Sequence, residues 1–144
     1  MATKNFKLSK NFTYEEMVNS PTAKRLGIDN APNQKELECL KQLCQKILQP
    51  IRDRRGSSIT VTSGYRCEKL NTIVGGSKTS QHRFGQAADI TLGNPTLNKK
   101  LFNMIVDMIN KKQITVGQLI DEYNYRWLHI SLPYTKVNNI IHIK

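Results

Sequence analysis

The chain has 144 residues, of which 38% are hydrophobic and 23% are charged. This length allows one domain with a real hydrophobic core, and the composition excludes an intrinsically disordered chain. No apolar run approaches the roughly 18 residues that a transmembrane helix needs, so we expect no membrane span. The net charge of +11 favours polyanionic partners, which include nucleic acid, an anionic membrane and an acidic cell-wall polymer.

The N-terminal residues 1–7 lack the apolar core of a secretory signal, so we expect synthesis in the cytoplasm without a signal peptide. The three cysteines are Cys39, Cys44 and Cys67, an odd number without CxxC spacing. We interpret them as reduced and mostly buried small hydrophobic residues, not as a disulfide framework or a metal site.

Two short helices are predicted near the N-terminus. Thr13 and Glu16 have the spacing of a capping box, which predicts a helix that begins at Tyr14. Ser20 and Pro21 end this helix, and a second short turn is expected from there through residue 25.

The longest helix of the first half is predicted to begin after Asn33, with Glu36 three residues later as its capping partner. Pro50 lies inside this helix and should bend or loosen its last turn, and Gly56 should end it. Apolar residues recur at spacings of three and four and predict a core-facing stripe: Leu37, Leu40, Leu43, Cys44, Ile47, Leu48 and Ile51.

The second half of the chain mixes short strands with helices. A polar loop is predicted over residues 77–85, and a hairpin joins the strands at 118–123 and 127–132. The other strands are predicted at 59–63, 87–92 and 137–143, and helices at 67–74 and from residue 94. The pattern predicts an α+β fold, a single domain over residues 1–144 with a mostly antiparallel central sheet and flanking helices.

His82, Asp89 and His129 are the candidate metal ligands. Two imidazoles and one carboxylate are the ligand types of a catalytic zinc, which leaves its fourth position open for water. Gly85 allows a sharp turn between His82 and Asp89, and the alanines at 87 and 88 leave room beside an ion. The residues therefore predict a zinc site that is completed by a strand histidine forty residues further along.

Strand alternation assigns the residues around His129 to two faces. Trp127, His129 and Ser131 should face a cleft, while the alternate residues should face the core: Leu128, Ile130 and Leu132.

The general base of a zinc hydrolase is usually a carboxylate near the metal, and two neighbours are candidates, Asp121 and Glu122. Because alternation points them to opposite faces, only one can share the face of His129. An even number of residues in the hairpin loop would pair Glu122 with Trp127 and select Glu122, whereas an odd number would select Asp121. We prefer Glu122, whose longer side chain reaches further.

Arg66 follows the end of the first predicted strand through Ser63 and Gly64. A cation that leaves a strand end in this way can project into a cleft and bind a substrate carboxylate or a developing oxyanion. A surface salt bridge is the alternative interpretation of the residue taken alone.

Four motifs occur in order along the chain: Ser63–Arg66, Gly75–His82, Gly85–Asp89 and Trp127–His129. Together they resemble the zinc D-alanyl-D-alanine carboxypeptidase family, which includes phage-encoded cell-wall endopeptidases and shares its fold with the hedgehog signalling domain. The N-terminal segment and the end of the long helix also look like the small single-domain branch. The resemblance thus covers nearly the whole chain and implies a hedgehog/DD-peptidase-like fold.

The resemblance also implies roles for individual residues. His82, Asp89 and His129 match the family's zinc ligands, and Arg66 matches the arginine that steadies the substrate carbonyl. Ser80, two residues before the first ligand, matches a residue that lines the substrate cleft.

We further assign Tyr65 and Trp127 to substrate binding. One departure concerns the base: many members place the acid two or three residues before the last histidine, where this chain has Trp127 and Arg126. Glu122 lies seven residues before it, as if the hairpin loop were longer.

We therefore expect a zinc-dependent peptidase that hydrolyses peptide bonds in peptidoglycan stems or cross-links, as a phage endolysin or virion-associated lysin. Its partners would be bacterial peptidoglycan and anionic envelope polymers, and it would act as a monomer at the cell wall after release from the host cytoplasm. The alternative is a non-catalytic, zinc-stabilised binding domain of the same fold. Nucleic acid is not expected, because the chain has no helix-turn-helix pattern, CxxC finger or aromatic-plus-basic signature.

Overall fold

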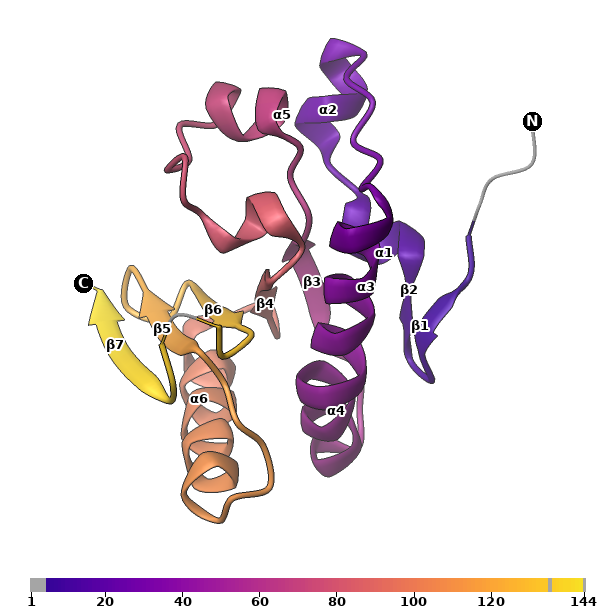
Figure 1. Cartoon of the computed structure of the whole chain (residues 1–144). Helices are drawn as coiled ribbons and strands as arrows, with labels where there is room; N and C mark the ends of the chain where they lie inside the picture. The colour runs from indigo at the N-terminus through magenta and orange to yellow at the C-terminus, as the bar shows by residue number, and fades with distance from the viewer. Residues whose placement is uncertain (1–4, 135, 144) are drawn as a thin grey trace.

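The computed structural model describes residues 5–134 and 136–143, in which short strands and helices alternate (Figure 1). The helices are α1 (Tyr14–Val18), α2 (Pro21–Leu26), α3 (Gln34–Leu43), α4 (Gln49–Arg55), α5 (Glu68–Ile73) and α6 (Pro95–Asn110). The strands are β1 (Lys7–Ser9), β2 (Phe12–Thr13), β3 (Thr60–Ser63), β4 (Ala87–Thr91), β5 (Gln118–Glu122), β6 (Trp127–Ser131) and β7 (Asn139–Ile143). The predicted single domain over residues 1–144 extends past the described residues and stays a prediction.

The N-terminal segment forms a small antiparallel ribbon, β1–β2, that sequence analysis did not predict. Leu8 and Phe12 are buried in the core, and the Gln49 side chain accepts hydrogen bonds from Ser9 Oγ and Asn11 N, both at 2.8 Å. Two- and three-residue strands are too short to show a periodic pattern, so contacts with α4 define them instead. The predicted helix after Thr13 is confirmed as α1, and its capping box forms.

The long helix predicted after Asn33 is confirmed, with its capping box to Glu36, but its irregularity lies earlier than expected. A π-helical turn, η1 (Cys44–Leu48), separates α3 from α4, and the Gln49 N–H donates to Cys44 O. Pro50 has no N–H to donate, so the hydrogen-bond ladder is adjusted in the turn before it and not after it. Gly56 ends α4 in the left-handed conformation at φ +78°, as predicted.

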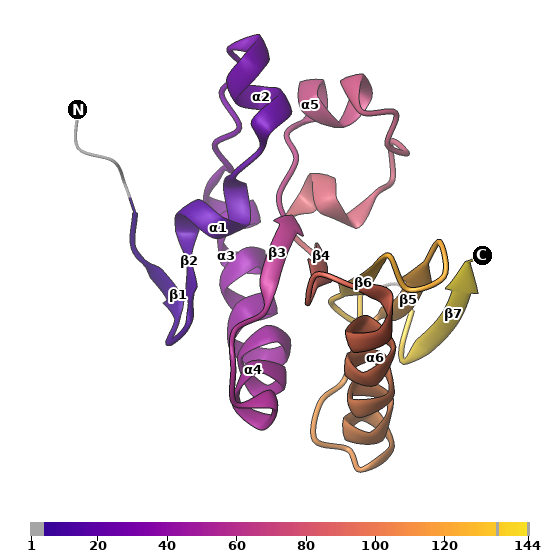
Figure 2. The same ribbon diagram turned by 180° about the vertical axis from the view of Figure 1, so that it is seen from behind.

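The central sheet has the strand order β3-β4-β6-β5-β7. All neighbouring pairs are antiparallel except β5 and β7, which are parallel, so the predicted α+β class with a mostly antiparallel sheet is confirmed. Both ribbon views show α6 beside the β5–β6 end of the sheet and α3–α4 on the side of β3 (Figures 1 and 2). Apolar residues of one sheet face join the core with these helices: Ile90, Leu119, Leu128 and Ile130.

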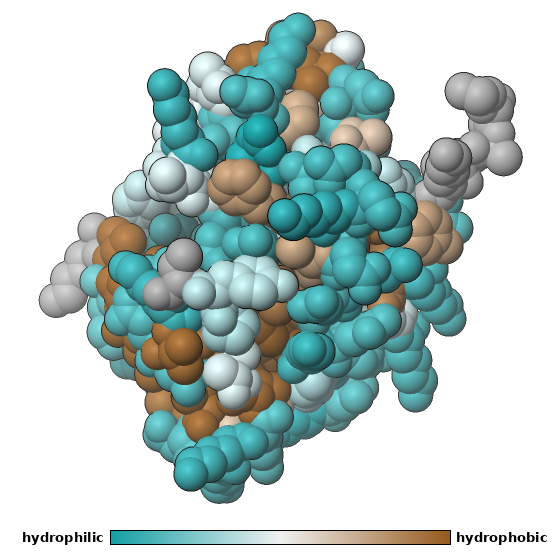
Figure 3. All heavy atoms as spheres, viewed as in Figure 1, coloured by the Kyte–Doolittle hydropathy of each residue, from teal (hydrophilic) through white to brown (hydrophobic). Residues whose placement is uncertain are grey.

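The face of the molecule shown in Figure 3 is mainly hydrophilic, and hydrophobic surface gathers toward the β7 side. Exposed apolar residues of this region include Val137, Ile140 and Ile143. Among the described residues, no helix combines the length and the apolar character required to cross a bilayer. The three cysteines carry free thiols, and burial raises the pKa of the Cys44 thiol to about 12.

Candidate functional site

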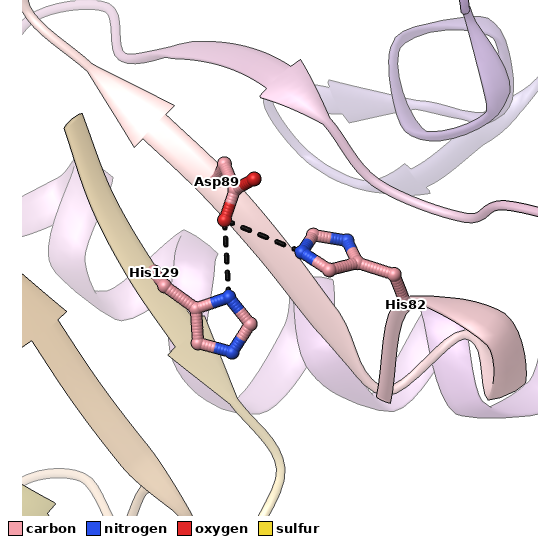
Figure 4. A group of neighbouring side chains, drawn as sticks. All are labelled: His82, Asp89 and His129. Carbon is pink, nitrogen blue, oxygen red and sulfur yellow. Dashed lines mark hydrogen bonds and ion pairs between the residues drawn. The ribbon is translucent and has the colours of Figure 1, made fainter. Parts of the chain in front are cut away.

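Three side chains from separate segments converge on the sheet face opposite the main core (Figure 4). Asp89 on β4 and His129 on β6 are direct partners in the antiparallel register, and His82 comes from a 3-10 turn, η2 (Gln81–Phe84). The Asp89 Oδ1 atom lies 3.0 Å from His129 Nδ1 and 3.3 Å from His82 Nε2. The structure thus brings together the three residues that sequence analysis singled out.

His82 is held by its surroundings in one orientation. Its ring is buried, and Nδ1 donates a hydrogen bond to Gly64 O at 2.7 Å. The residues predicted as loop contain the η2 turn, which Gly85 ends at φ +75°. A side chain at Gly85 would place Cβ 2.4 Å from Glu36 O, so both the backbone angle and the close packing require glycine.

The donor atoms suit a divalent cation. Because His82 uses Nδ1–H on Gly64, its Nε2 presents a lone pair toward the Asp89 carboxylate, and a cation between them would satisfy both. Ligands at tetrahedral angles about 2.0–2.1 Å from zinc stand about 3.3 Å apart. Asp89 Oδ1 lies at 3.0 and 3.3 Å from the two histidine nitrogens, and all three donor atoms lie within 4.8 Å of one another. The residues therefore fit a three-ligand zinc site.

The charge of Asp89 depends on its two histidine neighbours. Burial by itself raises the pKa of this carboxyl group, but the contacts with His129 and His82 lower it and prevail, so the pKa falls well below its usual range. Asp89 is therefore an anion at neutral pH, as a metal ligand must be.

A cavity of about 730 Å³ opens over the three side chains, and Arg66 and Glu122 both line it. The Arg66 Nε atom is buried without a hydrogen-bond partner among the described residues. Burial lowers the pKa of Arg66, while the negative charges of Asp89 and Glu122 raise it and offset part of the effect. A partly buried guanidinium with a free donor is suited to hold an oxygen that gains negative charge.

The hairpin between β5 and β6 decides which acid faces the cavity. Its loop has four residues, 123–126, and Glu122 pairs with Trp127 in the register. This is the even case, so Glu122 shares the face of His129. Asp121 is 2% exposed on the opposite face, where its carboxylate bonds to His142 Nδ1 on β7.

Of the other predicted substrate-binding residues, Ser80 and Trp127 line the cavity and Tyr65 does not. Tyr65 is 4% exposed within the hydrophobic core, and its hydroxyl donates to Glu36 Oε1 at 2.9 Å. Its neighbour Arg66, by contrast, lines the cavity. The assignment of Tyr65 to substrate binding is therefore corrected to a place in the core.

The cavity lining also includes residues that sequence analysis did not select as site residues, among them Gln81, Gln118, Tyr123 and Lys136. Alternation along β5 places Gln118 on the face of Glu122, so that residue could have been found from the pattern. Tyr123 and Lys136 belong to connections without a periodic pattern. Only the folded chain brings them beside the candidate metal ligands.

Comparison with known proteins agrees with this geometry. The sequence model of a family described as Peptidase M15 matches residues 10–131, which include the three convergent side chains, Arg66 and Glu122. A search of curated proteins found no match to the chain.

Proposed function

Because this chain belongs to the Peptidase M15 family, we propose that it is a zinc-dependent peptidase that hydrolyses peptide bonds in the stems or cross-links of bacterial peptidoglycan. The observation that carries the proposal is the convergence of His82, Asp89 and His129: each offers one possible ligand atom, and these three atoms lie within 4.8 Å of one another. Glu122 and Arg66 line the same cavity and supply a proton acceptor and an anion-binding group.

This mechanism uses five side chains of the cavity. His82, Asp89 and His129 would hold zinc, which when bound activates water and polarises a carbonyl oxygen. Glu122 accepts the proton of the attacking water and passes it to the leaving amine. Arg66, whose guanidinium lines the cavity, donates a hydrogen bond to the carbonyl oxygen as negative charge develops there.

The proposal extends to the setting in which the enzyme works. A phage endolysin or virion-associated lysin would act on the cell wall as a monomer after release from the host cytoplasm. The net charge of +11 would hold it on anionic envelope polymers, and this attraction would weaken as the salt concentration rises.

The test is digestion of purified sacculi by the zinc-loaded protein, with the released peptides identified by mass spectrometry. We expect digestion to stop in His82→Ala and after chelation, and to return when zinc is added back to the chelated protein. His142→Ala is the matched control, because this histidine lies on the opposite sheet face. Digestion that persists in His82→Ala would contradict the metal-dependent mechanism.

One observation favours a second function, a zinc-stabilised binding domain without turnover. The positions two and three before His129 hold Trp127 and Arg126, not an acid. This alternative predicts that chelation lowers the Tm while the zinc-loaded protein releases no peptide from sacculi.

A further inference from the structure

The cavity over the metal ligands has two chemically different ends along strand β5. Glu122 lies at one end, level with Trp127, and Gln118 lies at the other. Ile120, between them, pairs with His129 and marks the level of the metal ligands. A strand rises about 3.3 Å per residue, so each end lies about 7 Å from that level.

The end at Glu122 is aromatic. Tyr123 follows Glu122 with φ of +51°, and its ring lies 5.1 Å from the ring of Trp127. Tyr123 is 56% exposed, and the buried Trp127 Nε1 has no hydrogen-bond partner among the described residues. This end therefore offers an aromatic surface.

The end at Gln118 is cationic. Lys136 lines the cavity and precedes β7, whose first residue, Asn139, pairs with Gln118. Lys136 is exposed and takes part in no ion pair among the described residues. The two acids that line the described part of the cavity are Asp89, at the level of the metal ligands, and Glu122, at the far end. An unpaired ammonium in this position attracts an anion.

The position of Glu122 sets the direction in which a substrate lies. The group that passes a proton to the leaving amine must stand beside that amine, so the leaving part of the substrate occupies the end with Tyr123 and Trp127. The acyl part then runs past the metal ligands toward Lys136. An extended peptide covers the 7 Å to that end in about two residues.

We propose that Lys136 binds a carboxylate on the acyl part of the substrate, about two residues before the cleaved bond. The proposal rests on the peptidase function and narrows its substrate class to peptides with an acidic group on that side. Lys136 is then a specificity-determining residue, and it has no part in the bond-breaking step.

The experiment uses a pair of synthetic peptides built around the bond that mass spectrometry of digested sacculi identifies. They differ in one group, a free carboxylate or its amide, two residues before the cleaved bond. We expect the wild-type kcat/KM to be about fivefold higher for the carboxylate, the size of an exposed ion pair. The preference should shrink as salt is added.

Two lysine variants separate this contact from a general loss of charge. Lys136→Gln should cleave both peptides with the same kcat/KM. Lys136→Glu should cleave the amide with the higher kcat/KM. Lys100→Gln removes the same charge from an exposed position of α6 and should keep the wild-type preference. Equal rates for both peptides in an active wild type, or a preference that survives in Lys136→Gln, would overturn the inference and leave the peptidase function intact.

A binding measurement tests the Lys136 contact even if the protein has no peptidase activity. If the zinc-loaded protein cleaves nothing, the pair is replaced by stem peptides that carry the acidic group free or amidated, and titration calorimetry measures their affinities. A carboxylate preference that disappears in Lys136→Gln supports the contact without catalysis. Equal affinity, or no binding of either peptide, counts against it.

Discussion

Each face of the central sheet carries a contact between an aspartate and histidine, but the surroundings of the two contacts differ. On the cavity face, Asp89 lies between two histidines, and Glu122 and Arg66 stand nearby. On the opposite face, the buried Asp121 bonds to one histidine, His142, on the edge strand β7. A carboxylate–histidine contact alone therefore does not identify a catalytic group, whereas the convergence of three donors on a cavity points to a metal.

The comparison extends to pairs of neighbours in the sequence. Asp121 and Glu122 are adjacent, as are Tyr65 and Arg66, and in each pair one residue is buried and the other lines the cavity. Alternation along β5 separates Asp121 from Glu122, whereas Tyr65 and Arg66 follow the end of β3 and differ in burial. Substitution of the residue that lines the cavity should therefore lower activity more than stability. Substitution of its buried neighbour should lower stability more than activity.

The largest effect is expected at Glu122. Glu122→Gln removes the proton acceptor but leaves the three metal ligands in place, so kcat on sacculi should fall by about 10²–10⁴. Zinc content, measured by atomic absorption, should stay at the wild-type level. Asp121→Asn is the matched control and should keep activity within a few fold, and the reverse result would make Asp121 the base.

Arg66→Ala should come next, with a loss of about 10²–10³ in kcat, because one donor to the developing oxyanion is removed. Arg66→Lys should restore little, since an ammonium cannot reproduce the fixed donor geometry of the planar guanidinium. Steady-state kinetics on the cleaved peptide would check both variants. An effect confined to KM would mean that Arg66 stabilises the bound substrate and the transition state equally.

His142→Ala should affect stability more than catalysis. It leaves the buried Asp121 carboxylate without its partner, which costs about 1–3 kcal/mol in the free energy of unfolding. Urea denaturation would measure the loss, and Asp121→Asn combined with His142→Ala should cost less than the sum of the single variants. Strict additivity of the two would contradict a direct interaction.

The smallest effect is expected at Tyr65. Tyr65→Phe removes the hydrogen bond to Glu36 and should lower the free energy of unfolding by about 1 kcal/mol. The kcat/KM should not change, because the side chain lies in the core outside the cavity. A large loss of activity with unchanged stability would restore Tyr65 to substrate binding.

Much of the fold was predictable because its signals are local. Capping boxes at Thr13 and Asn33 predicted where two helices begin. Alternation placed Trp127 and His129 correctly at the cavity, but Ser131, predicted to face it as well, is buried and does not line it. The π-turn before Pro50 and the β1–β2 ribbon were not predictable, because each depends on contacts with distant segments.

For the site, the sequence by itself determined the ligand types and their spacing, and the condition under which Glu122 would face His129. Only the tertiary structure decided that the hairpin loop is even, through three successive residues with positive φ, Tyr123, Asn124 and Tyr125. It also turned Tyr65 into the core and brought Lys136 to the cavity. Residue spacing encodes periodicity within an element, but the face that a residue presents depends on turns and packing that no local pattern contains.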